Sequence, residues 1–120
     1  MKKKENLRAK GCYYEQIAGA FLEKKGYQIL EYNFRCSYSE IDIIARDGRY
    51  LVFCEVKYRK GKDIVRSLEA INLKKQKRVS MAALFYIATH HIVAESCRFD
   101  VVGITSEEIV HIQNAFDFGG

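Results

Sequence analysis

The chain has 120 residues, 48% of them hydrophobic, and carries 20 Lys and Arg against 15 Asp and Glu, a net charge of +5. A chain of this size can bury about two thirds of its unfolded surface, so a single domain over residues 1–120 is expected without disulfides or a structural metal. No apolar run approaches the roughly 18 residues of a membrane span, and the lysine-rich start lacks a signal peptide's apolar core, which predicts a cytoplasmic protein with no membrane contact.

The pattern of apolar residues predicts seven elements in the order αβββαββ. They are a helix over 6–25 that stops at Gly26, strands over 27–34, 40–46 and 50–59, a helix from an N-cap at Ser67 to residue 89, and strands over 98–104 and 109–112. Three meandering strands followed by a helical crossover imply an α/β fold with a mixed β-sheet flanked by helices.

Four cysteines are spread along the chain without Cys-x-x-Cys spacing: Cys12, Cys36, Cys54 and Cys97. This spacing argues against a zinc site or a disulfide framework. The four residues are interpreted as small buried hydrophobes in a reducing compartment.

A β-hairpin is predicted around Asp47-Gly48, which lies between two runs of β-branched and aromatic residues. If the hairpin loop has an even length, positions 40, 42 and 44 share a sheet face with positions 53, 55, 57 and 59. The side chains brought together would be those of Glu40, Asp42, Glu55 and Lys57. An odd-length loop would put Asp42 and Glu55 on opposite faces, because a slip of one residue inverts every side chain. The predicted site therefore depends on the parity of the loop.

Neighbouring carboxylates repel each other unless a proton, a lysine or a metal ion lies between them. Oxygen ligands without a nearby His or Cys suit Mg²⁺ or Mn²⁺, here bound by Asp42, Glu55 and the backbone carbonyl of Val56. Such a site would serve phosphodiester hydrolysis, with Lys57 orienting the attacking water or stabilising the charge on phosphorus. A solvated strand face on which Lys57 merely pairs with a carboxylate explains the same pattern, and the residues alone leave both alternatives open.

Several motifs in a fixed order carry a family resemblance. They are Asn33-Phe34-Arg35-Cys36, Glu40-Ile41-Asp42, Glu55-Val56-Lys57-x-Arg59, Arg98-Phe99-Asp100-Val101-Val102 and Asn114-Ala115-Phe116. Asp42 with Glu55-Val56-Lys57 resembles the D…ExK core of the restriction-endonuclease-like nuclease superfamily. The whole set, from about Gly11 to Phe116, resembles the small bacterial YraN-like family of predicted endonucleases. Ser39 departs from the pattern, since the family commonly has a glycine there.

The resemblance implies a restriction-endonuclease-like core and a metal-dependent DNA endonuclease. By similarity to archaeal Holliday-junction resolvases, which share this core, Glu15 would be a further acidic residue of the site. The residue lies at the edge of the apolar stripe of the first helix, a position that an ordinary boundary glutamate also fits. It is expected to reach the site only if that helix packs on the face that carries Asp42 and Glu55.

Basic residues gather next to the proposed site. Residues 57–78 hold nine Lys or Arg against two acidic residues, and residues 1–10 hold five against one. The first stretch supplies the predicted nucleic-acid-binding residues Arg59, Lys60, Lys62, Lys74, Lys75, Lys77 and Arg78. A basic rim around an acidic centre is typical of a nuclease, since the rim captures phosphates. Lys75 is singled out because it falls on the apolar stripe of the second helix, where it either extends to solvent or turns toward a phosphate.

Other polar and aromatic residues receive weaker assignments. His90, His91 and His111 lack an acidic or thiol partner at metal spacing and are interpreted as surface or cap residues. Asp100 is expected to pair with a neighbouring arginine or to close a strand end. Four tyrosines, Tyr13, Tyr14, Tyr58 and Tyr86, have rings that can stack on unpaired bases, although core packing is the favoured interpretation for Tyr14 and Tyr86.

The favoured function is a Mg²⁺- or Mn²⁺-dependent DNA endonuclease, with Asp42 and Glu55 as metal ligands, Lys57 as the catalytic lysine, and Glu40 and Glu15 in secondary roles. The alternative is a module of the same fold that binds nucleic acid or a repair partner without cutting. The sequence leaves open whether the substrate is duplex, branched or single-stranded, and whether two chains pair as a homodimer.

Overall fold

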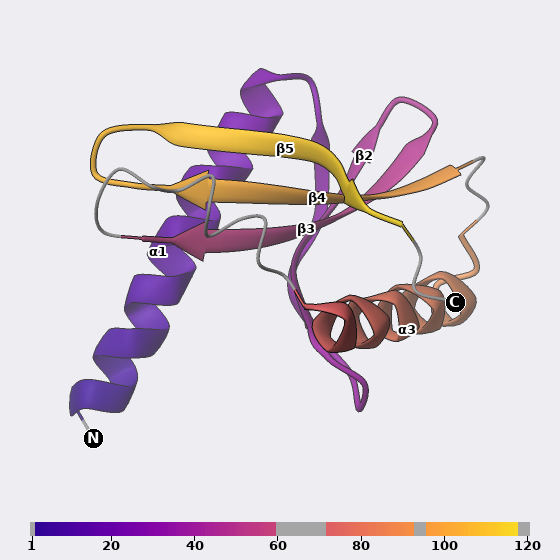
Figure 1. The fold of residues 1–120 in the computed structure, drawn as a ribbon, viewed down its shortest axis with the longest axis horizontal. Coiled ribbons are helices and arrows are strands. Elements are labelled where there is room, and N and C mark those ends of the chain that lie inside the picture. Colours follow the sequence, from indigo (N-terminus) through magenta and orange to yellow (C-terminus); the bar gives the residue numbers. More distant parts are fainter. Residues whose placement is uncertain (1, 60–71, 93–95, 118–120) are drawn as a thin grey trace.

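The structure, a computed structural model, describes residues 2–59, 72–92 and 96–117, with side chains from residue 13 onward. Its elements are α1 (Lys2–Lys24), β1 (Gln28–Arg35), β2 (Glu40–Asp47), β3 (Tyr50–Tyr58), α3 (Leu73–Thr89), β4 (Ser96–Ile104) and β5 (Ile109–Phe116). The strands form one sheet in the order β1-β2-β3-β4-β5, in which β3 and β4 are parallel and the other pairs antiparallel (Figure 1). The predicted order αβββαββ and the mixed sheet are confirmed.

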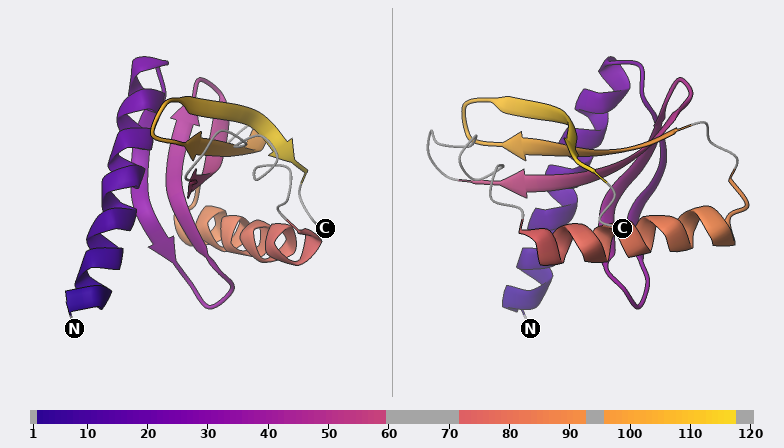
Figure 2. Two further views of the ribbon diagram at one scale, coloured as in Figure 1. Left: turned by 60° about the vertical axis from the view of Figure 1, so that its left-hand side comes forward. Right: turned by 45° about the vertical axis from the view of Figure 1, so that its right-hand side comes forward.

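The two described helices cover opposite faces of the sheet, as Figure 2 shows. On one face, Ala18 and Leu22 of α1 pack against Ile43 and Cys54. On the other face, α3 packs its buried residues Val79, Ala82, Ala83 and Tyr86 against a cluster that contains Ile44 and Phe53. Each strand therefore alternates between the two cores, as the period of two predicts for a sheet covered on both sides. No helix among the described residues is long and apolar enough to cross a membrane.

The helix ends have local causes. Gly26 ends α1 at φ +96°, and the N–H groups of Gly26 and Tyr27 donate to the carbonyls of Glu23 and Leu22 in a Schellman arrangement, so the predicted stop is confirmed. The second helix was predicted to start after Ser67, and this is wrong for α3, which starts at Leu73. This helix is capped by Asn72, whose side-chain oxygen accepts from the N–H of Lys75 at 2.8 Å. Ser67 lies outside the described residues.

The β2–β3 hairpin has a two-residue loop, since Asp47 pairs with Tyr50. Gly48 adopts φ +58°, the positive value that a type II′ turn needs at its first central position. The loop length is thus even, and the register continues through Ile44 opposite Phe53 to Ile43 opposite Cys54. Extended by one residue, this register puts Asp42 opposite Glu55 on the face covered by α3.

The sheet splits just beyond that point. Pairing between β2 and β3 ends at Ile43 and Cys54, whereas β2 continues to Glu40 alongside β1 and β3 continues to Tyr58 alongside β4. The two halves diverge in Figure 1, where β1 and β2 run toward α3 and β3 runs toward the far end of β4. This fork between β2 and β3 leaves backbone groups at its base that the ladder no longer pairs, so side chains can enter between the strands.

A buried polar network lies on the α1 side of the sheet around Asp100, which is fully buried. Its carboxylate accepts from Arg98 Nε at 2.9 Å, from the N–H of Asn114 at 3.0 Å and lies 2.8 Å from His111 Nε2. Burial alone would raise the pKa of Asp100, but these hydrogen bonds outweigh it and lower that pKa. The predicted pairing of Asp100 with a neighbouring arginine is confirmed. The surface assignment of His111 is wrong, because its side chain is only 1% exposed.

The structure also places His90, Ser39 and three of the cysteines. His90 is the C-cap of α3, as one of its two predicted alternatives states. Ser39 needs no glycine-like backbone, because the described non-glycine residues with positive φ are Asn33, His91 and Asn114. Of the cysteines with described side chains, Cys54 is buried while Cys36 and Cys97 are half-buried, and all three are free thiols.

Candidate metal centre

Asp42 lies at the base of the fork between β2 and β3. Its Oδ2 accepts a hydrogen bond from the N–H of Val56 at 2.9 Å. In a continued ladder that N–H would donate to a β2 carbonyl, so the carboxylate replaces the lost backbone acceptor at the point where the strands part. The bond fixes the Asp42 side chain between the strands, with one carboxylate oxygen still available to a ligand.

Three carboxylates meet in the fork. One oxygen each from Glu15, Glu40 and Asp42 lie within 4.8 Å of one another. Glu40 and Asp42 lie two positions apart on β2, so their side chains share one face of the strand. Glu40 also forms an exposed ion pair with Arg35 at 3.5 Å. Glu15 comes from α1, which covers the opposite face of the sheet. The expectation that Glu15 arrives only if α1 packs on the Asp42 face is therefore wrong, because the fork lets this side chain reach the site from the other side.

Glu55 is the fourth carboxylate and belongs to β3. It is 8% exposed, and the nearby charge of Asp42 contributes to raising the pKa of its carboxyl group. The ammonium group of Lys75, from the first turn of α3, lies 3.8 Å from Glu55 Oε1. Lys75 thus turns inward toward a carboxylate of the site. The structure brings Asp42 and Glu55 together on one face, and Glu55 joins the three-carboxylate group through Asp42.

The electrostatics of the site show how tightly these acids are crowded. Burial raises the pKa of Glu55 to about 8, with a further contribution from the charge of Asp42, and the nearby charges of Lys75 and Lys57 only partly offset the rise. Burial and the charge of Asp42 likewise raise the pKa of Glu15 to about 7. The described residues therefore supply too little positive charge to stabilise the ionised forms of Glu15 and Glu55. Neither carboxyl group is ionised easily at neutral pH.

Two buried oxygens of the site have no hydrogen-bond partner among the described residues, Oε2 of Glu15 and Oε1 of Glu55. The lysine at 3.8 Å is too distant to donate to the second of them. A buried acceptor without a donor costs about 1–3 kcal/mol, so these atoms favour a ligand that supplies positive charge. The donor set consists of carboxylate oxygens, which suits a hard divalent cation such as Mg²⁺ or Mn²⁺.

Lys57 and Val56 complete the inner part of the site. Lys57 follows Glu55 by two positions on β3, so the two side chains project from the same face of the strand, and the charge of Lys57 lowers the pKa of Glu55. The N–H of Val56 faces Asp42. In a strand the N–H and C=O of one residue face the same neighbour, so the Val56 carbonyl is directed toward the fork as well.

The predicted basic rim is only partly described. Lys60 and Lys62 lie outside the described residues, and Arg59 is exposed and donates from Nη1 to the carbonyl of Tyr58 at 2.9 Å. On α3, Lys74, Lys77 and Arg78 are exposed. At 100° per residue Lys77 lies about 160° around the helix from Lys75 and so faces away from the site, whereas Arg78 lies about 60° and Lys74 about 100° from Lys75, both on the same side of it.

Sequence reasoning missed Asn33 as part of the site. This residue lies in β1 with φ +55°, and its side chain hydrogen-bonds to Glu15, which lowers the pKa of that carboxyl group and so opposes the effect of burial. A small cavity of about 110 Å³ lies beside these two residues, lined also by Gln16 and Tyr32. Asn33 opens the first of the resembling motifs, a hint of its importance that the hairpin argument did not use.

Comparison with known proteins places residues 14–104 in a match to the family described as "Uncharacterised protein family UPF0102". A UPF0102 protein of Lachnoclostridium phytofermentans is 44% identical over 116 residues, covering 96% of this chain and 98% of the relative. A UPF0102 protein of Syntrophus aciditrophicus is 44% identical over 117 residues, with 94% and 91% covered. One of Thermotoga maritima is 48% identical over 99 residues, with 82% and 89% covered. The family match spans the whole fork from Glu15 to Lys75.

Proposed function

We propose that this chain, which belongs to the protein family UPF0102, is a metal-dependent endonuclease that hydrolyses phosphodiester bonds in DNA. The observation that carries the proposal is the pair of unpartnered buried oxygens on Glu15 and Glu55, of which the first belongs to the group of three carboxylates formed by Glu15, Glu40 and Asp42 and the second lies beside that group. A pure nucleic-acid binder gains nothing from such a group, because carboxylates repel phosphates unless a cation lies between them. The membership agrees with the YraN-like resemblance, and the assignment to the restriction-endonuclease-like superfamily belongs to the proposal.

In this proposal, Asp42 and Glu55 are the principal ligands of Mg²⁺ or Mn²⁺, supported by the Val56 carbonyl, with Glu15 and Glu40 completing the acidic centre. The bound cation would lower the pKa of a water molecule and neutralise charge that develops on phosphorus. Lys57 holds the attacking water or stabilises the phosphoryl oxygens, as a lysine next to a scissile group can do. Lys75 lies 3.8 Å from Glu55 Oε1 and would be free to contact a phosphate if a bound cation offset the charge of Glu55.

The test is cleavage of a panel of linear, flap, junction and single-stranded DNA with Mg²⁺, Mn²⁺ or EDTA. Asp42→Asn, Glu55→Gln and Lys57→Ala should each reduce metal-dependent cleavage by roughly 10³-fold or more, since each removes several kcal/mol of transition-state stabilisation. Glu23→Gln, at an exposed position near the end of α1, is the matched control and should cut like the wild type.

Metal binding needs a readout of its own. Isothermal titration with Mn²⁺ should show a site in the wild type and in Glu23→Gln, and a strongly weakened one in Asp42→Asn and Glu55→Gln. Equal cleavage by wild type and Glu55→Gln would indicate a contaminating nuclease and refute the proposal. Binding of DNA without cleavage under any condition would instead support the non-catalytic module.

A further inference from the structure

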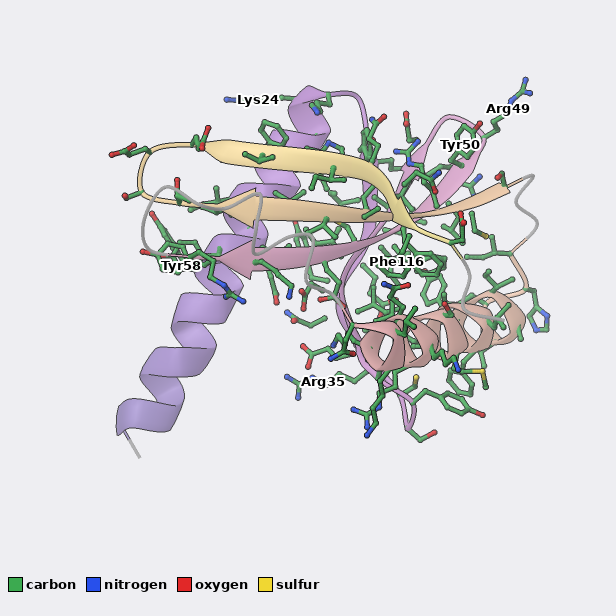
Figure 3. All side chains as sticks on the ribbon, in the orientation of Figure 1. Lys24, Arg35, Arg49, Tyr50, Tyr58 and Phe116 are labelled. Carbon is green, nitrogen blue, oxygen red and sulfur yellow. The ribbon has the colours of Figure 1, made fainter. Side chains whose placement is uncertain are left out.

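A cleft outside the candidate metal centre lies at the far end of β3, between α1 and the turn that joins β4 to β5. It has a volume of about 420 Å³ and is lined by Tyr13, Tyr14, Ile17, Tyr58 and residues 104–109. Figure 3 labels Tyr58 at the tip of β3 beside α1, and Tyr50 at the opposite end of the same strand. The volume falls within the range of about 300–1,000 Å³ that small-molecule pockets have, which suits one nucleotide and excludes a double helix.

Aromatic rings form one wall of this cleft. The rings of Tyr14 and Tyr58 are stacked, with centroids 4.0 Å apart and planes 16° apart. Tyr13 stands edge-on to Tyr14 at 5.3 Å and 71°, and is 59% exposed. A large ring this exposed gains nothing from the core of the protein, whereas a flat partner can stack on it. Tyr13 thus contacts the ring of Tyr14, which is itself stacked on Tyr58.

Two of the elements that line the cleft, α1 and β3, also carry residues of the candidate metal centre. Tyr14 adjoins Glu15 on α1, and Tyr58 adjoins Lys57 on β3. At about 3.3 Å per residue, Tyr58 lies roughly 10 Å along β3 from Glu55, and because the two residues are three positions apart their side chains lie on opposite faces of the sheet. A DNA strand with a phosphate at the metal centre therefore reaches the cleft by passing the edge of β3 that the fork leaves unpaired, and the base that enters lies a few nucleotides from that phosphate.

The opposite rim of the cleft is acidic. Glu107 and Glu108 are exposed on the β4–β5 turn, where the hydroxyl of Thr105 accepts the N–H groups of both residues and fixes the turn. Carboxylates repel the phosphates of a DNA backbone, so the backbone should pass outside while an uncharged base enters. Carboxylates also accept hydrogen bonds from the amino groups of bases.

We infer that this cleft, lined by Tyr13, Tyr14 and Tyr58, binds an unpaired nucleobase a few nucleotides from the scissile phosphate. The inference rests on the proposed nuclease function and narrows its substrate class to DNA that has unpaired nucleotides, such as single strands, flaps or bulges. A base inside an intact duplex is already paired and stacked, and cannot enter the cleft without being extruded.

The test compares affinities in EDTA, so that no cleavage occurs. The probes are a 20-nucleotide single strand, the blunt duplex of the same sequence, and that duplex with a three-nucleotide bulge. The wild type should bind the single strand and the bulge more tightly than the blunt duplex. Tyr13→Ala should weaken binding of those two probes by about 5- to 100-fold, the usual loss for one base–aromatic stack, and change blunt-duplex binding less than twofold.

Two control variants separate stacking from an altered fold. Tyr13→Phe keeps the ring and should retain the wild-type preference. Tyr50→Ala removes a ring that is 39% exposed at the opposite end of β3, and should also retain it. Photocrosslinking of a 5-iodouracil in the bulge, followed by mass spectrometry, should map to Tyr13, Tyr14 or Tyr58.

The outcomes distinguish this inference from the proposed function. If Tyr13→Ala binds all three probes like the wild type, or if crosslinks form elsewhere, the cleft does not bind a base, while metal-dependent cleavage by the wild type would still support the nuclease. If the wild type binds no DNA at all, both the cleft and the nuclease proposals are refuted.

Discussion

The crowding of carboxylates in the fork predicts that Glu55 lowers the stability of the metal-free protein at high pH. The pKa of Glu55 is raised from 4.5 to about 8, so between these values the folded state keeps a proton that the unfolded state has lost. The free energy of unfolding therefore falls as pH rises from about 4.5 to about 8, and remains low above that. At 1.36 kcal/mol per pKa unit the full shift corresponds to at most about 5 kcal/mol, and the part due to Asp42 is shared between the two residues.

Glu55→Gln removes this titration and keeps the size of the side chain. At pH 9, in EDTA and reducing agent, we expect the variant to be more stable than the wild type by about 2–5 kcal/mol. For a chain of this length that difference raises the midpoint of thermal unfolding by roughly 4 °C per kcal/mol. At pH 4, below both pKa values, the two proteins should differ little. Circular dichroism melts at pH 4, 6 and 9 measure the effect.

Two controls accompany these melts. Glu23→Gln, on the exposed part of α1, should melt within about 0.5 kcal/mol of the wild type at every pH. Mg²⁺ at 100 times its Kd should raise the free energy of unfolding of the wild type at pH 9 by about 2.7 kcal/mol, and that of Glu55→Gln by much less. A Glu55→Gln protein that gains no stability between pH 4 and pH 9 relative to wild type would refute the electrostatic account of the fork.

Two further predictions concern the same site. Asp42→Asn should be more stable than Asp42→Ala by about 1 kcal/mol in urea denaturation, because the amide oxygen still accepts the N–H of Val56; equal stabilities would show that this bond contributes nothing. Replacing both Lys74 and Arg78 by Ala should reduce the slope of log K against log salt for duplex DNA by about 1.8, while Lys77→Ala, on the far side of α3, should leave it unchanged. Equal slopes in all three proteins would place the DNA elsewhere.

The sequence by itself determined the features that depend on neighbours along the chain. The hairpin at Asp47-Gly48 follows from turn chemistry between two strand-forming runs, and its even loop puts Asp42 opposite Glu55 without reference to any other element. Gly26 ends α1 for an equally local reason, since it alone can adopt the left-handed conformation there without strain. The order αβββαββ follows from these short-range patterns.

Local sequence patterns gave two wrong predictions, one for the start of the second helix and one for the exposure of His111. The apolar positions before Asn72 continued the 3.6-residue repeat of the second helix, so the N-cap was predicted at Ser67 rather than at Asn72. His111 has no acidic residue at metal spacing in the sequence, and its partner Asp100 becomes a neighbour only when β5 folds back along β4. Burial of a polar side chain depends on that distant partner, which periodicity does not contain.

Only the tertiary structure decided how the acidic centre is assembled. Glu15 reaches Asp42 from the helix on the opposite face because β2 and β3 part after Ile43 and Cys54, and Lys75 reaches Glu55 because α3 crosses the other face at that point. Neither contact has a counterpart in sequence spacing. Pairing register is a local property of a hairpin, whereas the divergence of two paired strands and the approach of two helices are set by the packing of both cores at once.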